Sequence, residues 1–284
     1  MGPLMKSRIK NGLRRSLANR HERSDHSQRR RSAATRGFVA TGRVRGFRCL
    51  GCGLAALRPR GQSVSEKDTL PLAWITGAGG LIGHYLVEEA ERQTLPWHVR
   101  GLTRRDLDLT DYAAVDRAFE RDRPALVIHC AAMSRSPQCS ADPAAARLQN
   151  VDVTRHLAGL AREVLFVFFS TDLVFDGERG GYDESALVRP LSVYAETKVA
   201  AEQIVATHPR HWIVRTSLNG GTSPTGDRGF NEQLRRDWQA GRTVWLFTDE
   251  HRSPVFAGVT ARATWELVER APAGLYHVAG AERL

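Results

Sequence analysis

The sequence predicts an α/β fold, a Rossmann-type doubly wound parallel sheet with a small, incomplete C-terminal domain. Apolar, strand-like runs and segments with helical spacing alternate about five times from Leu70 onward, which is typical of parallel strands joined by crossover helices. The first strand-to-helix turn also carries three glycines spaced three residues apart, in TGAGGLIG. Glycines at this spacing are typical of the first turn of a doubly wound sheet.

Each element is expected from its residue pattern. Short apolar runs that end at polar or glycine residues predict buried strands over 72–76, 97–103, 125–131, 164–170 and 212–217. Apolar residues that recur every three or four positions predict helices over 81–93, 111–123, 142–163 and 193–208. Asp111 and Asp142 are suited to cap two of these helices, and Pro143 fits a first helical turn.

Beyond residue 217 the chain is expected to leave the sheet and build a smaller unit. The pattern there predicts a helix over 228–244 that Gly241 ends, a turn at Ser253-Pro254, a helix through Trp265 and Leu267, and a final strand.

Composition is that of an ordinary globular protein, but charge is unevenly distributed. The chain has 284 residues, of which 42% are hydrophobic and 25% charged, so it can bury a sizeable core. Residues 1–70 hold 17 of the 41 Lys and Arg but only 4 of the 31 Asp and Glu, so they carry +13 and residues 71–284 carry −3. The high pI therefore belongs to a tail, and no specific nucleic-acid partner is expected.

Residues 1–69 are expected to form a basic, disordered N-terminal extension, because they are rich in Arg and Ser and have no sustained apolar period. Three interpretations stay open: an organelle transit peptide, a basic arm that touches nucleic acid or anionic lipid, and a wrongly chosen start codon. An extension that is non-functional or removed by processing is favoured.

Cysteine content and hydropathy argue against a disulfide-rich protein, a zinc protein and a membrane protein. Four cysteines do not make a disulfide framework, and Cys130 lies in a buried-strand run. Cys49 and Cys52 have the spacing of half a zinc site, but no second Cys or His pair follows at a suitable distance, so no metal is expected. No apolar run approaches the ~18 residues of a membrane span, which makes the cytoplasm the default compartment and excludes a membrane partner.

The glycine turn is expected to hold the diphosphate of a dinucleotide. Gly77 permits the bend, Gly80 lets the backbone approach a phosphate, and Gly83 lets the helix pack closely on the strand. Leu81 and Ile82 would place unpaired N–H groups and the positive end of the helix dipole at the same point. Residues 70–217 are therefore expected to be an NAD(P)-binding Rossmann domain, and residues 218–284 the substrate-binding part.

Two further motifs fall on the same edge of the sheet. In FFSTDLVFDG, Ser170, Thr171 and Asp172 end a buried strand. In YAETK, the four-residue spacing of Tyr194 and Lys198 puts both side chains on one face of a helix, about one turn apart. Alone, such a pair is usually solvated, but here it opens the next helix of a dinucleotide fold.

With these motifs the chain resembles the short-chain dehydrogenase/reductase superfamily of the extended type, and more narrowly the dTDP-4-dehydrorhamnose reductase family. The resemblance covers roughly residues 72–284 and includes the blocks RDLDLTDYAAV, FFSTDLVFDG, RPLSVYAETKVAAEQIV, VRTS and LYHVAG. It implies an NADPH- or NADH-dependent reductase of a nucleotide-linked 4-keto-6-deoxy sugar.

The resemblance also implies roles for individual residues. Tyr194 would give the proton, Lys198 would lower the pKa of Tyr194 and bind the nicotinamide ribose, and Thr171 would bond the carbonyl oxygen. Asp172 would contact the sugar, and Arg252 is a plausible contact for the nucleotide diphosphate because guanidinium binds phosphate in two-point fashion. Further expected cofactor contacts are Arg104, Arg105, Asp108, Leu109, Ala131 and Ala132.

Three positions depart from the family pattern. Arg104 and Arg105 follow the second strand where an acid often binds the ribose, and they suit a 2′-phosphate, which favours NADPH, or are two solvated charges. His129 begins HCAA where the family usually has NAAA, and a buried residue satisfied by backbone is expected rather than a base. Leu218 follows RTS where an aromatic is frequent, which bears on the substrate more than on the chemistry.

Two other functions stay open on the same fold. One is a non-catalytic, nucleotide-binding regulatory protein like the regulatory subunit of methionine adenosyltransferase, and the other a nucleotide-sugar epimerase or dehydratase. A homodimer is a possible assembly. Family members run on past Leu284 with further helices, so weak binding of sugar nucleotide is expected of this chain.

Removal of residues 1–64 is predicted to leave the melting temperature and the NADPH affinity nearly unchanged, because this segment lacks the apolar periodicity of a packed element. Thermal melts and calorimetry on the full and shortened chains test this. A shortened chain that unfolds or loses cofactor binding would show that the extension is structural.

Overall fold

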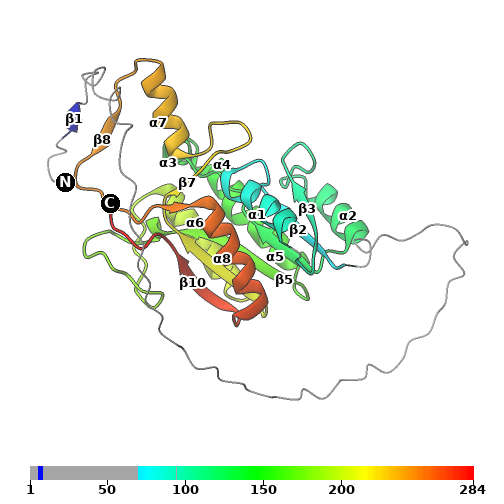
Figure 1. The fold of residues 1–284 in the computed structure, drawn as a ribbon. Coiled ribbons are helices and arrows are strands. Elements are labelled where there is room, and N and C mark those ends of the chain that lie inside the picture. Colours follow the sequence, from blue (N-terminus) through cyan, green and yellow to red (C-terminus); the bar gives the residue numbers. More distant parts are fainter. Residues whose placement is uncertain (1–5, 9–69, 94) are drawn as a thin grey trace, which may run out of the picture. The chain divides into compact units, whose positions relative to one another are not determined.

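The computed structural model describes residues 6–8, 70–93 and 95–284, and six parallel strands form its central sheet (Figure 1). The spatial order is β10-β6-β5-β4-β2-β3, so the winding direction reverses between β2 and β4, as in doubly wound sheets. The strands are β2 (Leu72–Thr76), β3 (His98–Leu102), β4 (Leu126–His129), β5 (Leu165–Thr171), β6 (His211–Thr216) and β10 (Gly274–Val278).

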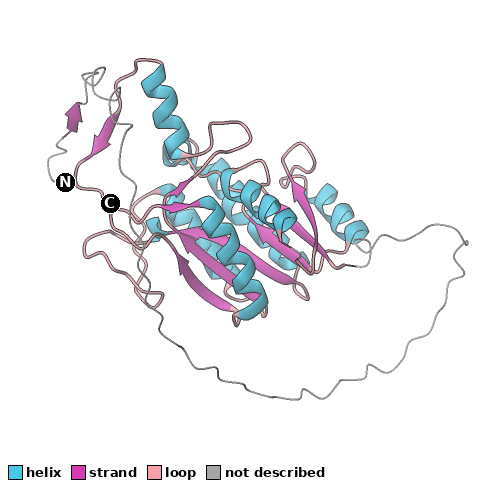
Figure 2. Cartoon of the chain, in the orientation of Figure 1, coloured by secondary structure: helices cyan, strands magenta, loops and turns pink. Residues whose placement is uncertain are grey.

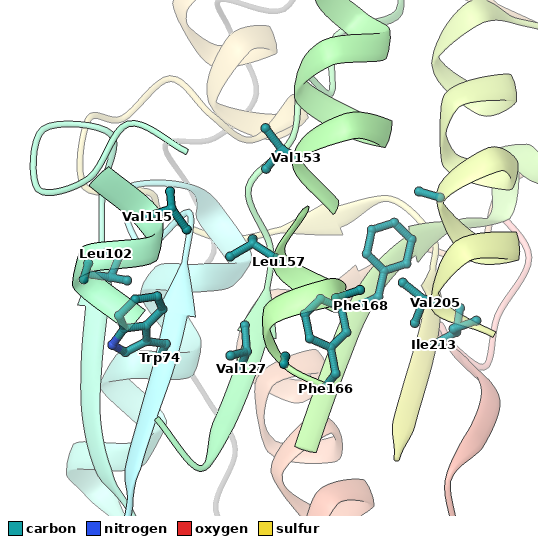
Figure 3. Packing of buried hydrophobic residues seen from close by; sticks show 14 residues of the cluster. Trp74, Leu102, Val115, Val127, Val153, Leu157, Phe166, Phe168, Val205 and Ile213 are labelled. Atoms are coloured by element: carbon teal, nitrogen blue, oxygen red, sulfur yellow. The ribbon is translucent and has the colours of Figure 1, made fainter. Parts of the chain in front are cut away.

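Helices cover both faces of the sheet (Figure 2). On one face, α2 (Tyr112–Asp122), α5 (Val153–Leu160) and α6 (Val193–Val205) enclose a core around Phe166 and Phe168 of β5 (Figure 3). On the other face, α1 (Leu81–Arg92) packs against α8 (Ala257–Arg270), with Leu86 and Trp265 fully buried between them and the sheet. The predicted Rossmann-type α/β class is confirmed.

The two predicted caps hold, but the helix predicted over 142–163 is broken. Asp111 accepts from the Ala114 N–H at 3.0 Å, and Asp142 accepts from the Ala145 N–H at 2.9 Å. Instead of one helix the chain forms α4 (Pro143–Arg147), a π-helical turn η2 (Leu148–Asp152) and α5, preceded by α3 (Ser136–Ala141). A π turn in an otherwise α-helical segment is often associated with a functional position.

The C-terminal segment returns to the sheet, which differs from the boundary expected at residue 217. β10 pairs in parallel with β6, and the indole N–H of Trp265 in α8 donates to the Leu86 carbonyl at 3.1 Å. The physical reason is burial, since Leu275 and Val278 of β10 pack against the two core clusters. Outside the sheet lie β7 (Asn219–Gly220), α7 (Phe230–Gln239), β8 (Trp245–Phe247) and β9 (Val255–Phe256), with β7 and β9 paired in parallel.

Within the extension expected to be disordered, the structure describes one short element. Lys6–Arg8 form β1, which pairs antiparallel with β8, so backbone pairing orders these three residues. Cys49 and Cys52 lie outside the described residues. In the part of the chain that is described, no helix has both the length and the apolarity to cross a membrane.

A buried ion pair fixes α6 to the sheet. Arg215 of β6 donates from Nε to Glu202 Oε1 at 2.9 Å and from Nη2 to Glu202 Oε2 at 2.7 Å. The Arg215 and Glu202 side chains are only 6% and 8% exposed, and the guanidinium also lies 5.2 Å from the Phe175 ring centroid. Because both charges are out of water, loss of one partner leaves the other uncompensated.

Glu202→Gln is predicted to lower the free energy of unfolding by about 3–5 kcal/mol, the usual cost of leaving one buried charge unpaired. Urea unfolding measures this. The control is Asp237→Asn, which removes the acid from an exposed Arg242–Asp237 pair and should cost no more than about 1 kcal/mol. Equal losses in the two variants would contradict the prediction.

Candidate active site

The glycine turn between β2 and α1 is too narrow for side chains. Gly77 has φ +73°, and a Cβ there would lie 2.7 Å from the Ala131 nitrogen, in the loop after β4. A Cβ on Gly83 would lie 2.4 Å from the Gly77 carbonyl oxygen. The turn therefore packs directly against the loop after β4, at the point where the winding of the sheet reverses and ligands of such folds bind.

The start of α1 offers donors beside this turn. The first N–H that bonds back along the helix is that of His84, which donates to Gly80 O at 3.1 Å. The N–H groups of Leu81 and Ile82 precede it and have no intrahelical acceptor, and the positive end of the helix dipole lies with them. A turn in which three of the four residues 77–80 are glycine, in front of these donors, fits the diphosphate of a dinucleotide.

The loop after β3 holds the two predicted arginines at the surface. Arg104 Nη2 lies 3.2 Å from Asp108 Oδ2, in a pair whose side chains are 74% and 41% exposed. Asp108 Oδ1 accepts from the N–H and the hydroxyl of Thr110, and these bonds lower the pKa of Asp108. Arg105 is exposed, and Leu109 is partly buried against the core. The structure thus brings Arg104 to Asp108 and leaves Leu109 as a packing residue at the base of the loop.

Thr171 and Tyr194 meet at the carboxyl end of β5. Thr171 ends β5 and is 6% exposed, and Tyr194 lies in the first turn of α6, which Ser192 caps by accepting from the Ala195 N–H. A hydrogen bond joins the Thr171 and Tyr194 side chains. The net effect of its surroundings raises the pKa of Tyr194, chiefly through desolvation, with Cys139 and Asp172 adding to the rise. This direction is opposite to the lowering of the pKa expected from Lys198, because desolvation outweighs the Thr171 hydrogen bond and the positive charge of Arg252, which act to lower it.

Lys198 lies one turn further along α6 and is 4% exposed. Its Nζ is 4.0 Å from the centroid of the Phe168 ring, in a cation–π contact. Burial lowers the pKa of Lys198 to about 8, although Glu202 and Cys130 act to raise it. The side chain is therefore mostly charged at neutral pH and loses its charge as the pH rises past 8.

Asp172 and Arg252, the two expected substrate contacts, bind one another. Arg252 donates from Nη2 to Asp172 Oδ1 at 2.5 Å and from Nε to Asp172 Oδ2 at 2.8 Å. Ser217 Oγ also donates to Asp172 Oδ2, at 2.6 Å. The structure thus brings the two residues expected to contact the substrate together in one ion pair.

His129 is buried, as expected, but its partners are side chains rather than backbone. Its Nδ1 lies 2.7 Å from Thr76 Oγ1 and its Nε2 lies 3.1 Å from Thr154 Oγ1. The Thr154 hydroxyl donates to the Asn150 carbonyl, so it accepts from Nε2–H, and Nδ1 accepts from Thr76. Burial lowers the pKa of His129 to about 3, and the ring is a neutral core residue.

Asn150 is a site residue that the pattern did not reveal. It lies in the π turn and is 1% exposed. Its Oδ1 accepts from the Met133 N–H at 2.8 Å, while its Nδ2 donates to Met133 O and to Thr197 Oγ1. Asn150 therefore ties the loop after β4 to α6 beside Lys198. The signal in the sequence was an amide inside an otherwise amphipathic helical segment.

This fold and this arrangement of a glycine turn, a hydroxyl residue at the end of β5 and a Tyr–Lys helix define a short-chain dehydrogenase/reductase of the extended type. The family model described as RmlD substrate binding domain matches residues 73–284, and the chain belongs to that family.

The chain is also similar to proteins with known names and to solved structures. The dTDP-4-keto-6-deoxy-D-glucose reductase of Streptomyces niveus is 34% identical, over 72% of this chain and 70% of that protein. Methionine adenosyltransferase 2 subunit beta of Xenopus laevis is 35% identical, over 50% of this chain and 45% of that protein. The structure of dTDP-4-dehydrorhamnose reductase from Bacillus anthracis in complex with NADP is 27% identical with a TM-score of 0.68, and the match covers 76% of each chain.

The protein is predicted to bind NADPH more tightly than NADH, because Arg104 and Arg105 are exposed on the loop after β3 and would give a 2′-phosphate charge-assisted hydrogen bonds. The double substitution Arg104→Ala and Arg105→Ala should reduce this preference. Calorimetry with both cofactors tests this. Arg155→Ala is a matched control, because Arg155 is also exposed and paired with an Asp, but on α5. Equal affinities of the unmutated chain for the two cofactors would refute the prediction.

Proposed function

We propose that this protein is an NADPH-dependent reductase of a nucleotide-linked 4-keto-6-deoxy sugar. The observation that carries the proposal is the contact of Thr171 with Tyr194 at the sheet edge, one helical turn from buried Lys198. Membership of the RmlD family and the similarity to a dTDP-4-keto-6-deoxy-D-glucose reductase support the substrate class. The similarity to an NADP complex supports the cofactor.

The cofactor would lie along the carboxyl edge of the sheet. The turn of Gly77, Gly80 and Gly83 and the N–H groups of Leu81 and Ile82 would hold its diphosphate, and Arg104 and Arg105 its 2′-phosphate. Ala131 and Ala132 follow β4 and, with Asp108 and Leu109, would line the site. When bound, the reduced nicotinamide supplies the hydride that reduces the ketone.

Tyr194 is the proposed proton donor. Hydride addition turns the ketone oxygen into an alkoxide, which needs a proton, and a phenol of raised pKa stays protonated through the neutral range. Thr171 is placed to donate a hydrogen bond to the same oxygen and stabilise its developing charge. Lys198, charged below about pH 8, would favour the phenolate left after transfer and bind the ribose.

A non-catalytic, nucleotide-binding role is the second candidate, because half of the chain matches a methionine adenosyltransferase 2 subunit beta at 35% identity. An epimerase would use the same fold without net consumption of NADPH. Loss of absorbance at 340 nm with NADPH and a panel of 4-keto nucleotide sugars separates these functions. NADPH binding without any turnover would favour the regulatory role. A homodimer and a cytoplasmic location remain predictions.

Tyr194→Phe is predicted to keep NADPH affinity and to lose most of the turnover, because general acid catalysis is commonly worth ~10²–10⁴-fold. Steady-state rates and calorimetry measure the two effects. Tyr276→Phe is the control: its hydroxyl bonds the Pro272 carbonyl on the exposed end of β10, and it should turn over normally. Near-normal rates in Tyr194→Phe would refute the assignment.

A further inference from the structure

The carboxylate of Asp172, next to the hydroxyl of Thr171, accepts several short hydrogen bonds. Oδ2 accepts from Ser217 at 2.6 Å and from Arg252 Nε at 2.8 Å, and Oδ1 accepts from Arg252 Nη2 at 2.5 Å. Ser217 is itself held in place, since its Oγ accepts from the Ser253 N–H at 3.2 Å. Three short bonds from groups that follow β6 or precede β9 thus converge on a residue at the end of β5.

The fourth hydrogen bond to this carboxylate is the longest, and its donor is Thr171, beside the proposed reaction site. Thr171 Oγ1 donates to Asp172 Oδ1 over 3.3 Å, well beyond the ~2.7–2.8 Å of a normal O–H···O bond. Thr171 is also the hydrogen-bond partner of Tyr194. A line of contacts therefore runs from Arg252 through Asp172 and Thr171 to Tyr194.

A hydroxyl has one proton to donate. If Thr171 gives this proton to Asp172, it cannot give it to the ketone oxygen of a substrate. An anionic carboxylate next to Thr171 would win that competition, because charge-assisted hydrogen bonds are about twice as strong as neutral ones. The bidentate Arg252 contact shifts the balance, since it neutralises the carboxylate and occupies the oxygen that faces Thr171.

We infer that Arg252 is a positioning residue for the reduction, which keeps Asp172 occupied so that the Thr171 hydroxyl stays available to the substrate carbonyl. The inference rests on the proposed reductase function. It replaces the separate expectations that Asp172 binds the sugar and that Arg252 binds the diphosphate.

The charges around Tyr194 agree with this role. Desolvation is the main cause that raises the pKa of Tyr194, and Cys139 and Asp172 add to the rise, whereas the Thr171 hydrogen bond and Arg252 act to lower it. Glu250 is the other acid at Arg252, with Oε1 3.2 Å from Nη1. Removal of Arg252 would therefore leave the acid Asp172 uncompensated beside both the hydrogen-bond donor and the proton donor.

A double-mutant cycle tests the inference. Arg252→Gln should lower kcat by about tenfold or more, because loss of one donor to a developing oxyanion typically costs about 10²–10³ and Thr171 would be only partly diverted. Asp172→Asn in the same chain should restore a large part of kcat, since the neutral amide attracts the Thr171 proton less strongly. Arg252→Lys keeps the charge without the bidentate geometry, so its kcat should lie between that of the unmutated chain and that of Arg252→Gln.

Arg242→Gln is the control, because Arg242 also donates two hydrogen bonds to an acid, from Nε and Nη2 to Asp237 Oδ1 at 2.8 and 2.6 Å, on exposed α7 and its C-terminal loop. It should leave kcat and KM unchanged. A direct diphosphate contact would instead raise KM in Arg252→Gln, leave kcat nearly intact and give no rescue by Asp172→Asn. That result would overturn the inference.

A crystal structure of Arg252→Gln gives a readout that needs no turnover. The Thr171–Asp172 contact should shorten from 3.3 Å to about 2.7 Å and lengthen again in the double variant. An unchanged distance in Arg252→Gln would contradict the inference even if the unmutated chain is an active reductase. Absence of turnover in the unmutated chain, with the shortened contact present, would instead contradict only the proposed function.

Discussion

The absence of space between β2 and α1 is the constraint on which the rest of the site depends. A Cβ at Gly83 would lie 2.4 Å from the Gly77 carbonyl oxygen, and one at Gly77 would meet the backbone of Ala131. Because Gly77 and Gly83 leave no room for a side chain, α1 begins directly behind the strand with its first N–H groups at the carboxyl edge. The same edge carries Thr171, since parallel strands all end there. Close backbone packing thus determines where phosphate and reacting carbonyl can lie.

The site also depends on a fixed position of α6 relative to the sheet. Glu202 and Arg215 join this helix to β6 through two buried hydrogen bonds, and Asn150 joins it to the loop after β4 through Thr197. Lys198 lies between these two attachments, over Phe168. Tyr194, the proposed proton donor, is one turn away, so its distance from Thr171 is set by contacts that no substrate has to make.

Local patterns in the sequence predicted most of the elements and which motifs lie at the carboxyl edge of the sheet. Asp111 and Asp142 cap helices as expected, and the glycine, Thr171 and Tyr–Lys motifs converge on one edge. Contacts between distant residues were not predictable. Asp172 and Arg252 are 80 residues apart, and a pattern that suggested two ligand contacts could not show that their charges neutralise each other. The final strand was predicted, but its pairing with β6 was not, because that pairing joins residues about 60 positions apart in the sequence.

The return of the chain to the sheet gives the segment between β6 and α8 an architectural meaning. Both ends of this segment, near Ser217 and Ala257, are buried against the central sheet and its helices, so the segment begins and ends at the same body of the fold. Insertions or deletions within it would leave the register of β6 and β10 intact. Such a layout lets the exposed part of this segment, around α7 and β8, vary in length while Ser217 and Arg252 at its two ends keep their contacts with Asp172.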